Sequence, residues 1–228
     1  MPDAPNQFYG LARGIAEIVL NHSWEENKVI DVLLYGSALT GSAPDDIDLL
    51  VLHSNGANMG NYTGSKSQPS EGQDILYLSP SEILRTIGYR KSEGMENGVF
   101  ERVYRLLAEA GVIQLDGGTF NPAQLNKILD LHVLNTHLLR ESSDPLEFAL
   151  FLAGVSSEKR AMFTMPYNPR FDARISQLRQ EAMRLSGKDL GFYHNILGNG
   201  RLYDFSTRDF TARFEDKYQD KLKLFQPV

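Results

Sequence analysis

Two aspartates, Asp46 and Asp48, stand one residue apart at the start of the apolar stretch DIDLLVLH. Side chains alternate across a β-strand, so residues two apart point to the same face and these two carboxylates lie side by side. Two such carboxylates repel each other unless a proton or a cation lies between them. Mg²⁺ fits this position, because it takes oxygen ligands and is bound by one or two carboxylates together with substrate phosphates. The pair therefore predicts a site for Mg²⁺ or Mn²⁺.

A Gly36-Ser37 turn ends the preceding apolar stretch VIDVLLY, and eight residues separate it from Asp46. Glycine leaves the backbone without a side chain, serine adds a hydroxyl, and exposed N–H groups in such a turn bind phosphate oxygens. A phosphate-binding turn beside a carboxylate pair is the apparatus of phosphoryl or nucleotidyl transfer. Gly36, Ser37, Asp46 and Asp48 are therefore candidate site residues.

The composition is that of an ordinary globular protein, with 42% hydrophobic and 23% charged residues. The length predicts a single domain over residues 1–228, with room for an insertion. The chain contains no cysteine, which excludes disulfides and thiolate metal sites. The formal net charge of −6 argues against strong nonspecific binding of nucleic acid. No signal pattern and no apolar run of about 20 residues is present, so we expect a cytoplasmic protein that does not enter a membrane.

The hydrophobic pattern predicts helices and strands in alternation. Helices are expected over 6–20, 80–88, 99–111, 144–154, 172–187 and the start of 188–206, and a short helix from Asn121-Pro122. Strands are expected over 29–36, 46–53, 74–79 and about 128–134, with a hairpin over 112–120. We expect a turn region at 37–46, a loop at 54–73 and a surface helix or arm at 214–228. The aromatic residues of GFYHNILGNGRLYDF are expected to pack in the core.

The order of these features resembles the polymerase-beta-type nucleotidyltransferase superfamily. The similarity is greatest to its small bacterial members, the minimal and antibiotic-modifying nucleotidyltransferases, in which Gly-Ser precedes Asp-hydrophobic-Asp-hydrophobic. This chain has Gly36-Ser37 followed by Asp46-Ile47-Asp48-Leu49, after a slightly shorter linker than the family has. Gly41 stands where these families often have a second glycine, whereas Thr40 replaces their usual arginine. The resemblance covers residues 29–53.

The resemblance implies a third carboxylate on an adjacent strand, and two residues qualify. Asp130 is framed by apolar residues in ILDLHVLNTHLL, and Asp74 opens DILYLS. Family members often follow the third strand with a helix and a closing segment like DLGFYHNILGNGRLYD, residues 189–204 here, which favours Asp130. That choice makes residues 54–125 an insertion between the second and third site strands. His132 shares a strand face with Asp130 and is placed to touch an acceptor.

The fold that the resemblance implies is α/β (α+β), the nucleotidyltransferase fold, with a short mixed sheet flanked by helices and an inserted helix-hairpin segment. The implied activity is metal-dependent transfer of AMP from ATP to a hydroxyl, with release of pyrophosphate. Asp46, Asp48 and Asp130 are the implied metal ligands and catalytic residues, and Gly36 and Ser37 hold the nucleoside triphosphate. The acceptor is a small molecule, a protein or an RNA end; acceptor, nucleotide preference and oligomeric state stay open. The alternative is an inactive nucleotide-binding or regulatory module of the same fold.

Overall fold

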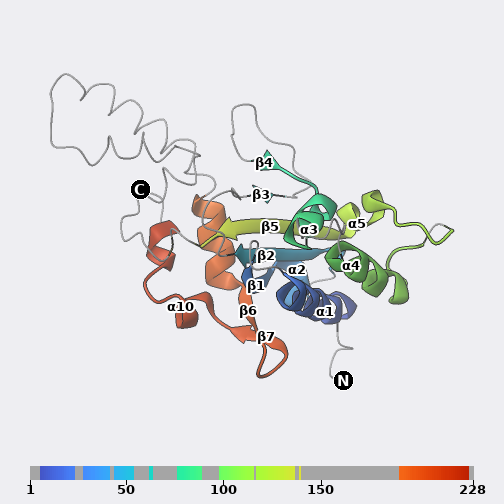
Figure 1. Cartoon of the computed structure of the whole chain (residues 1–228). Helices are drawn as coiled ribbons and strands as arrows, with labels where there is room; N and C mark the ends of the chain where they lie inside the picture. The colour runs from blue at the N-terminus through green and yellow to red at the C-terminus, as the bar shows by residue number, and fades with distance from the viewer. Residues whose placement is uncertain are drawn as a thin grey trace, which may run out of the picture.

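The computed structural model of the chain is a mixed α/β structure with helices on both faces of one sheet (Figure 1). The described residues are 6–23, 28–41, 44–53, 62–63, 76–88, 98–115, 117–136, 139 and 190–225. The α/β class and the mixed sheet flanked by helices are as the sequence predicts.

Most of the described elements lie where the apolar pattern places them. The helices are α1 (Gln7–His22), α2 (Gly36–Thr40), α3 (Pro80–Gly88), α4 (Gly98–Glu109), α5 (Pro122–Ile128), α10 (Phe214–Lys217) and the 3-10 helix η2 (Leu222–Phe225), and residues 190–199 are also helical. The strands are β1 (Val29–Tyr35), β2 (Ile47–His53), β3 (Tyr62–Thr63), β4 (Leu76–Tyr77), β5 (Leu129–Asn135), β6 (Arg201–Asp204) and β7 (Asp209–Ala212). In the described ranges, none of the helices has the length and apolar composition that a bilayer crossing requires.

The strands form a sheet in the order β4-β3-β5-β2-β1-β6-β7. Strand β2 is antiparallel to β1 and parallel to β5. The last residue of β1, Tyr35, lies opposite Asp48 of β2, and Asp48 lies opposite Asp130 of β5. The carboxyl end of β1 therefore meets the amino ends of β2 and β5 at one edge of the sheet.

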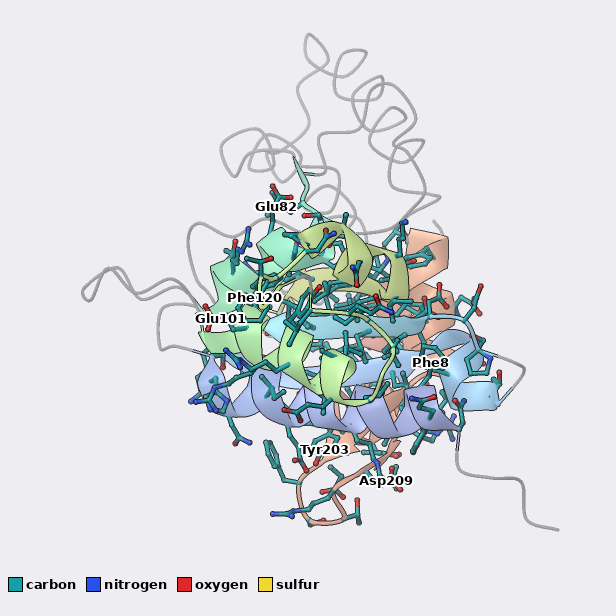
Figure 2. All side chains as sticks on the ribbon, turned by 90° about the vertical axis from the view of Figure 1, so that its right-hand side faces the viewer. Phe8, Glu82, Glu101, Phe120, Tyr203 and Asp209 are labelled. Carbon is teal, nitrogen blue, oxygen red and sulfur yellow. The ribbon has the colours of Figure 1, made fainter. Side chains whose placement is uncertain are left out.

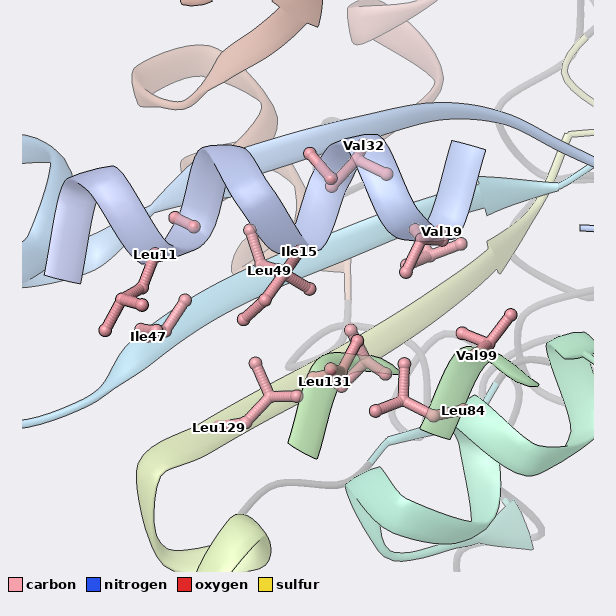
Figure 3. Packing of buried hydrophobic residues seen from close by; sticks show 14 of the residues in the cluster. Leu11, Ile15, Val19, Val32, Ile47, Leu49, Leu84, Val99, Leu129 and Leu131 are labelled. Carbon is pink, nitrogen blue, oxygen red and sulfur yellow. The ribbon is translucent and has the colours of Figure 1, made fainter. Parts of the chain in front are cut away.

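One face of the sheet is covered by α1, α3 and α4. Alternate residues of the three central strands point to this face and are fully buried there. Figure 3 shows α1 packing on these strand residues, with α3 and α4 beside them. The core members labelled there are Leu11, Ile15, Val19, Val32, Ile47, Leu49, Leu84, Val99, Leu129 and Leu131. We call this apolar layer the first core and the layer on the opposite face the second core. At about 1.5–3 kcal/mol for each fully buried Leu, Ile or Val, the first core holds β2 and β5 in register.

The opposite face has its own apolar core, to which the end of the chain contributes. Its buried members are Leu33, Leu50, Leu52, Leu134, Leu139, Leu190, Tyr193, Ile196, Leu197, Leu202, Phe214, Leu224 and Phe225. The surface helix or arm expected at 214–228 is therefore wrong for Phe214, Leu224 and Phe225, which are fully buried. The buried carboxylate of Asp31 also holds this segment, because Lys217 Nζ lies 2.5 Å from it and the Tyr218 hydroxyl donates to it.

Two hydrogen bonds join the β6–β7 hairpin to α1. The Tyr203 hydroxyl donates to Glu17 Oε1 at 2.6 Å, and the Tyr9 hydroxyl donates to Asp209 Oδ1 at 2.7 Å. Figure 2 shows Tyr203 and Asp209 on the hairpin next to α1. At the amino end of α1, Asn6 caps the helix by accepting from the Phe8 N–H, and its amide donates to the Ala38 carbonyl of α2 at 3.0 Å. Helix α1 thus links the far hairpin to the turn that follows β1.

Two predicted loops contain short elements. The turn region at 37–46 begins with α2, which starts at Gly36 and ends at Gly41, where φ is +76°. The loop predicted at 54–73 contains β3, which pairs with β5 over two residues. Both elements are too short to produce a recognisable apolar period, so the sequence pattern does not reveal them.

The hairpin predicted over 112–120 is present only as a trace: Thr119, after the turn, lies in a β-bridge, but no strand element forms among the described residues of this range. The α4 helix ends before Gly111, at φ +72°, and Val112 and Ile113 turn back onto the first core. The Tyr104 hydroxyl then holds both sides of the loop, donating to the Gln114 carbonyl at 2.9 Å and accepting from the Asn121 N–H at 3.1 Å. These two hydrogen bonds, rather than a long ladder, join the two sides of the loop.

Several predictions fall outside the described residues. These are the helices expected at 144–154 and 172–187 and the alternative third carboxylate, Asp74. The division of the chain by an insertion at 54–125 stays a prediction, although α3 and α4, which lie within it, share the core of α1 and the sheet.

His53, at the end of β2, gives a pH-dependent contribution to stability. Its side chain is 1% exposed, and burial lowers its pKa from 6.5 to about 4. As the pH falls from 6.5 towards 4, the unfolded chain binds a proton that the folded chain does not. The free energy of unfolding therefore falls across this window, by about 3 kcal/mol at most for this residue.

We expect the His53→Gln variant, which lacks this titration, to show a smaller loss of stability between pH 7 and pH 4.5 than the wild-type protein. Urea unfolding at a series of pH values measures the difference. All other titrating groups are common to both proteins, so equal losses in the two would contradict the prediction.

Candidate metal and phosphate site

The three aspartates selected from the sequence lie together at the edge where β1, β2 and β5 meet. Asp46 precedes β2, Asp48 is its second residue, and Asp130 is the second residue of β5. The parallel register places Asp48 directly opposite Asp130. Asp46, Asp48 and Asp130 each offer one carboxylate oxygen, and these oxygens lie within 4.8 Å of one another. We call this group the acidic triad.

Local strand geometry explains why the acidic triad is half-exposed although it belongs to buried strands. Leu49 and Leu129 point to the first core and are fully buried, whereas Asp48 and Asp130 point to the other face. The second core begins only further along these strands, at Leu50 and beyond. The three residues are therefore only partly buried, although one oxygen of Asp130 is fully covered, while the strands that carry them are fixed.

Gly36 brings the backbone of the following turn against Asp48. Its φ is +72°, a conformation that L side chains rarely adopt, and a Cβ there would lie 1.9 Å from Asp48 Oδ2. Only glycine therefore allows this carboxylate to lie where it does. Ser37 follows as the second residue of α2, and the Gly41 N–H donates to its carbonyl at 2.9 Å.

Burial and the negative charge of the site together raise the pKa of the Tyr35 hydroxyl. Burial raises the pKa of its hydroxyl well above the usual value, and the charges of Asp48, Asp130 and Asp46 raise it further. The phenol therefore keeps its proton at neutral pH. A cation at the acidic triad would relieve the same field.

His132 does not balance the negative charge of the triad. It follows Asp130 on the same strand face, as the sequence predicts, and burial lowers its pKa to about 4. The imidazole is therefore neutral at pH 7. It packs instead among rings: its centroid lies 6.3 Å from that of Tyr35 and 4.8 Å from that of Phe192.

The donor set of the triad fits a hard divalent cation. Carboxylate oxygens are the ligands that Mg²⁺ and Mn²⁺ prefer, and the described residues offer neither thiolate nor a charged imidazole at this place. Asp46, Asp48 and Asp130 could therefore hold such an ion.

Tyr35 and Phe192 also lie in this region, although the sequence pattern does not predict them as site residues. Tyr35 is detectable in principle, because it directly precedes Gly36 and shares a strand face with Leu33. Phe192 was expected in the core, like its neighbour Tyr193, but it is 37% exposed whereas Tyr193 is buried. Only the tertiary packing of its helix brings it to the site.

Comparison with known proteins provides no relative for this chain: no protein-family model matches it, and no curated protein or solved structure matches it either. The fold and the site by themselves define a class, a mixed α/β protein with three carboxylates gathered at one sheet edge beside a glycine turn.

Proposed function

We propose that the chain is a metal-dependent nucleotidyltransferase with the fold of the polymerase-beta-type superfamily. The observation that carries the proposal is the register of β2 and β5, which sets Asp130 opposite Asp48. The resemblance implies a third carboxylate on an adjacent strand, and Asp130 on β5 meets this requirement. The close contact between Gly36 and Asp48 supports it independently, because it sets the expected phosphate turn against the expected metal ligands.

The residues divide into those that bind the metal and those that bind phosphate. Asp46, Asp48 and Asp130 hold Mg²⁺ or Mn²⁺, which when bound supplies positive charge against the triphosphate and the leaving pyrophosphate. Gly36 and Ser37 offer a backbone without a Cβ and a hydroxyl to the phosphate oxygens.

In the proposed reaction, an acceptor hydroxyl attacks the α-phosphorus of a nucleoside triphosphate, ATP in the favoured case. The new bond joins the hydroxyl oxygen to that phosphorus, and the bond from the α-phosphorus to the bridging oxygen of pyrophosphate breaks. Asp130 takes the proton of the hydroxyl as general base. The acceptor is a small molecule, a protein or an RNA end, and the negative potential around Tyr35 favours a cationic acceptor over RNA.

The position of bond cleavage tests this proposal without knowledge of the acceptor, because water is an acceptor that is always present. We expect α-labelled ATP and Mg²⁺ to yield labelled AMP and pyrophosphate with the wild-type protein. Asp130→Asn should lower the rate by a factor on the order of 10² to 10⁴. Asp45→Asn should not, since Asp45 is exposed and lies outside the triad.

Two results would contradict the proposal. One is formation of ADP and phosphate, which would mean cleavage at the wrong phosphorus. The other is an Asp130→Asn variant as active as Asp45→Asn.

A further inference from the structure

Phe192 exposes an apolar ring in a helix whose other large apolar side chains are buried. It is 37% exposed, whereas Leu190, Tyr193 and Ile196 on the same helical segment are at most 5% exposed. Packing of this helix on the second core therefore explains its neighbours but leaves part of the Phe192 side chain in contact with solvent.

The Phe192 ring contacts two residues that are themselves neighbours of the acidic triad. Its centroid is 4.8 Å from that of His132, which shares a strand face with Asp130. It is also 6.2 Å from that of Tyr35, which lies opposite Asp48 in the β1–β2 ladder. Phe192, Tyr35 and His132 thus form a wall of three rings beside the carboxylates, which we call the ring wall.

The chemistry of the ring wall differs from that of the triad. Phe192 has no charged or hydrogen-bonding group in its side chain, and its nearest neighbours on this side are the rings of His132 and Tyr35. An uncharged aromatic surface does not hold phosphate, but it stacks well with a flat heteroaromatic ring. A nucleotide combines both needs, since its phosphates require the cation and its base requires an apolar platform.

We propose that Phe192 is the stacking platform for the nucleobase of the nucleotide whose phosphates lie at the acidic triad. The inference rests on the proposed function and adds a base subsite to it. Because stacking uses the π-face that every base has, this subsite accepts both purine and pyrimidine nucleotides, with a modest preference for the larger purine ring.

Calorimetric titration with ATP and with inorganic tripolyphosphate, each in the presence of Mg²⁺, separates the contribution of the base to binding from that of the phosphates. The wild-type protein should bind both. Phe192→Ala should weaken ATP binding by roughly ten-fold, the usual size of one stacking contact, and leave tripolyphosphate binding unchanged. Phe192→Trp should restore ATP binding. Phe205→Ala, which removes a 55% exposed ring on the β6–β7 turn, should change neither.

The outcomes distinguish this inference from the function on which it rests. Unchanged ATP binding by Phe192→Ala would overturn the base subsite, and so would an equal loss of both probes, which would indicate a structural role. In either case, binding of both probes by the wild type would leave the proposed function standing. Binding of neither probe by the wild type would overturn both proposals.

Discussion

The Asp48→Asn variant is expected to unfold at a higher temperature than the wild-type protein when no divalent cation is present. The triad oxygens lie within 4.8 Å of one another, so the ionised carboxylates repel. Two unit charges about 4 Å apart interact by about 4 kcal/mol at an effective dielectric of 20, and partial exposure lowers this to about 1 kcal/mol. Relief of one repulsion should raise the unfolding temperature by roughly 2–4 °C in a chain of this length.

Addition of Mg²⁺ should reverse the order of the two proteins. The wild-type protein gains stability because the cation binds only the folded state, whereas the variant lacks one of its three ligands and gains little. A thermal unfolding series with and without Mg²⁺ measures both effects, with Asp45→Asn as the matched control. A metal-free Asp48→Asn protein that unfolds below the wild type, or that keeps the full Mg²⁺ response, would disprove a functional triad.

Gly36→Ala is expected to abolish the Mg²⁺ response while leaving a folded protein. Its Cβ would lie 1.9 Å from Asp48 Oδ2, so the carboxylate must move away from its place in the triad. The displaced atoms belong to the end of a side chain, which can rotate, so the fold itself survives. The backbone, with φ at +72°, adds strain of about 1–2 kcal/mol.

The Gly41→Ala variant separates the effect of backbone strain from the effect of displacing the Asp48 carboxylate. Gly41 has a similar φ of +76°, but a Cβ there would have nothing within 4 Å. The two variants should therefore lose comparable stability in urea unfolding, yet only Gly36→Ala should lose Mg²⁺-dependent stabilisation. A Gly41→Ala protein that also fails to respond to Mg²⁺ would mean that backbone strain in α2, not contact with Asp48, accounts for the loss.

The part of the site that follows from local patterns is the part that the sequence predicts well. An apolar run ending at Gly36 and an apolar run beginning with Asp46 and Asp48 define β1 and β2, and strand alternation alone puts the two carboxylates on one face. The start at Asn121-Pro122 likewise predicts α5, and the apolar run ILDLHVLN predicts the strand that follows it.

The rest depends on pairings between distant segments, which leave no local signal. The sequence leaves Asp130 and Asp74 as alternatives; only the parallel register of β5 with β2 places Asp130 beside Asp48, and Asp74 lies outside the described residues. The exposure of Phe192 depends on how its helix packs on the second core. At the end of the chain, charged residues predict a surface arm, but Phe214 and the Asp31–Lys217 ion pair hold it in the core.

Diffraction from crystals soaked in Mn²⁺, recorded at a wavelength where manganese scatters anomalously, tests the central claim most directly. A peak within bonding distance of carboxylate oxygens from Asp46, Asp48 and Asp130 is the expected result, and it should vanish in Asp48→Asn crystals soaked alongside. A map with ordered manganese elsewhere on the protein and none among these three side chains would contradict a metal-dependent role for them.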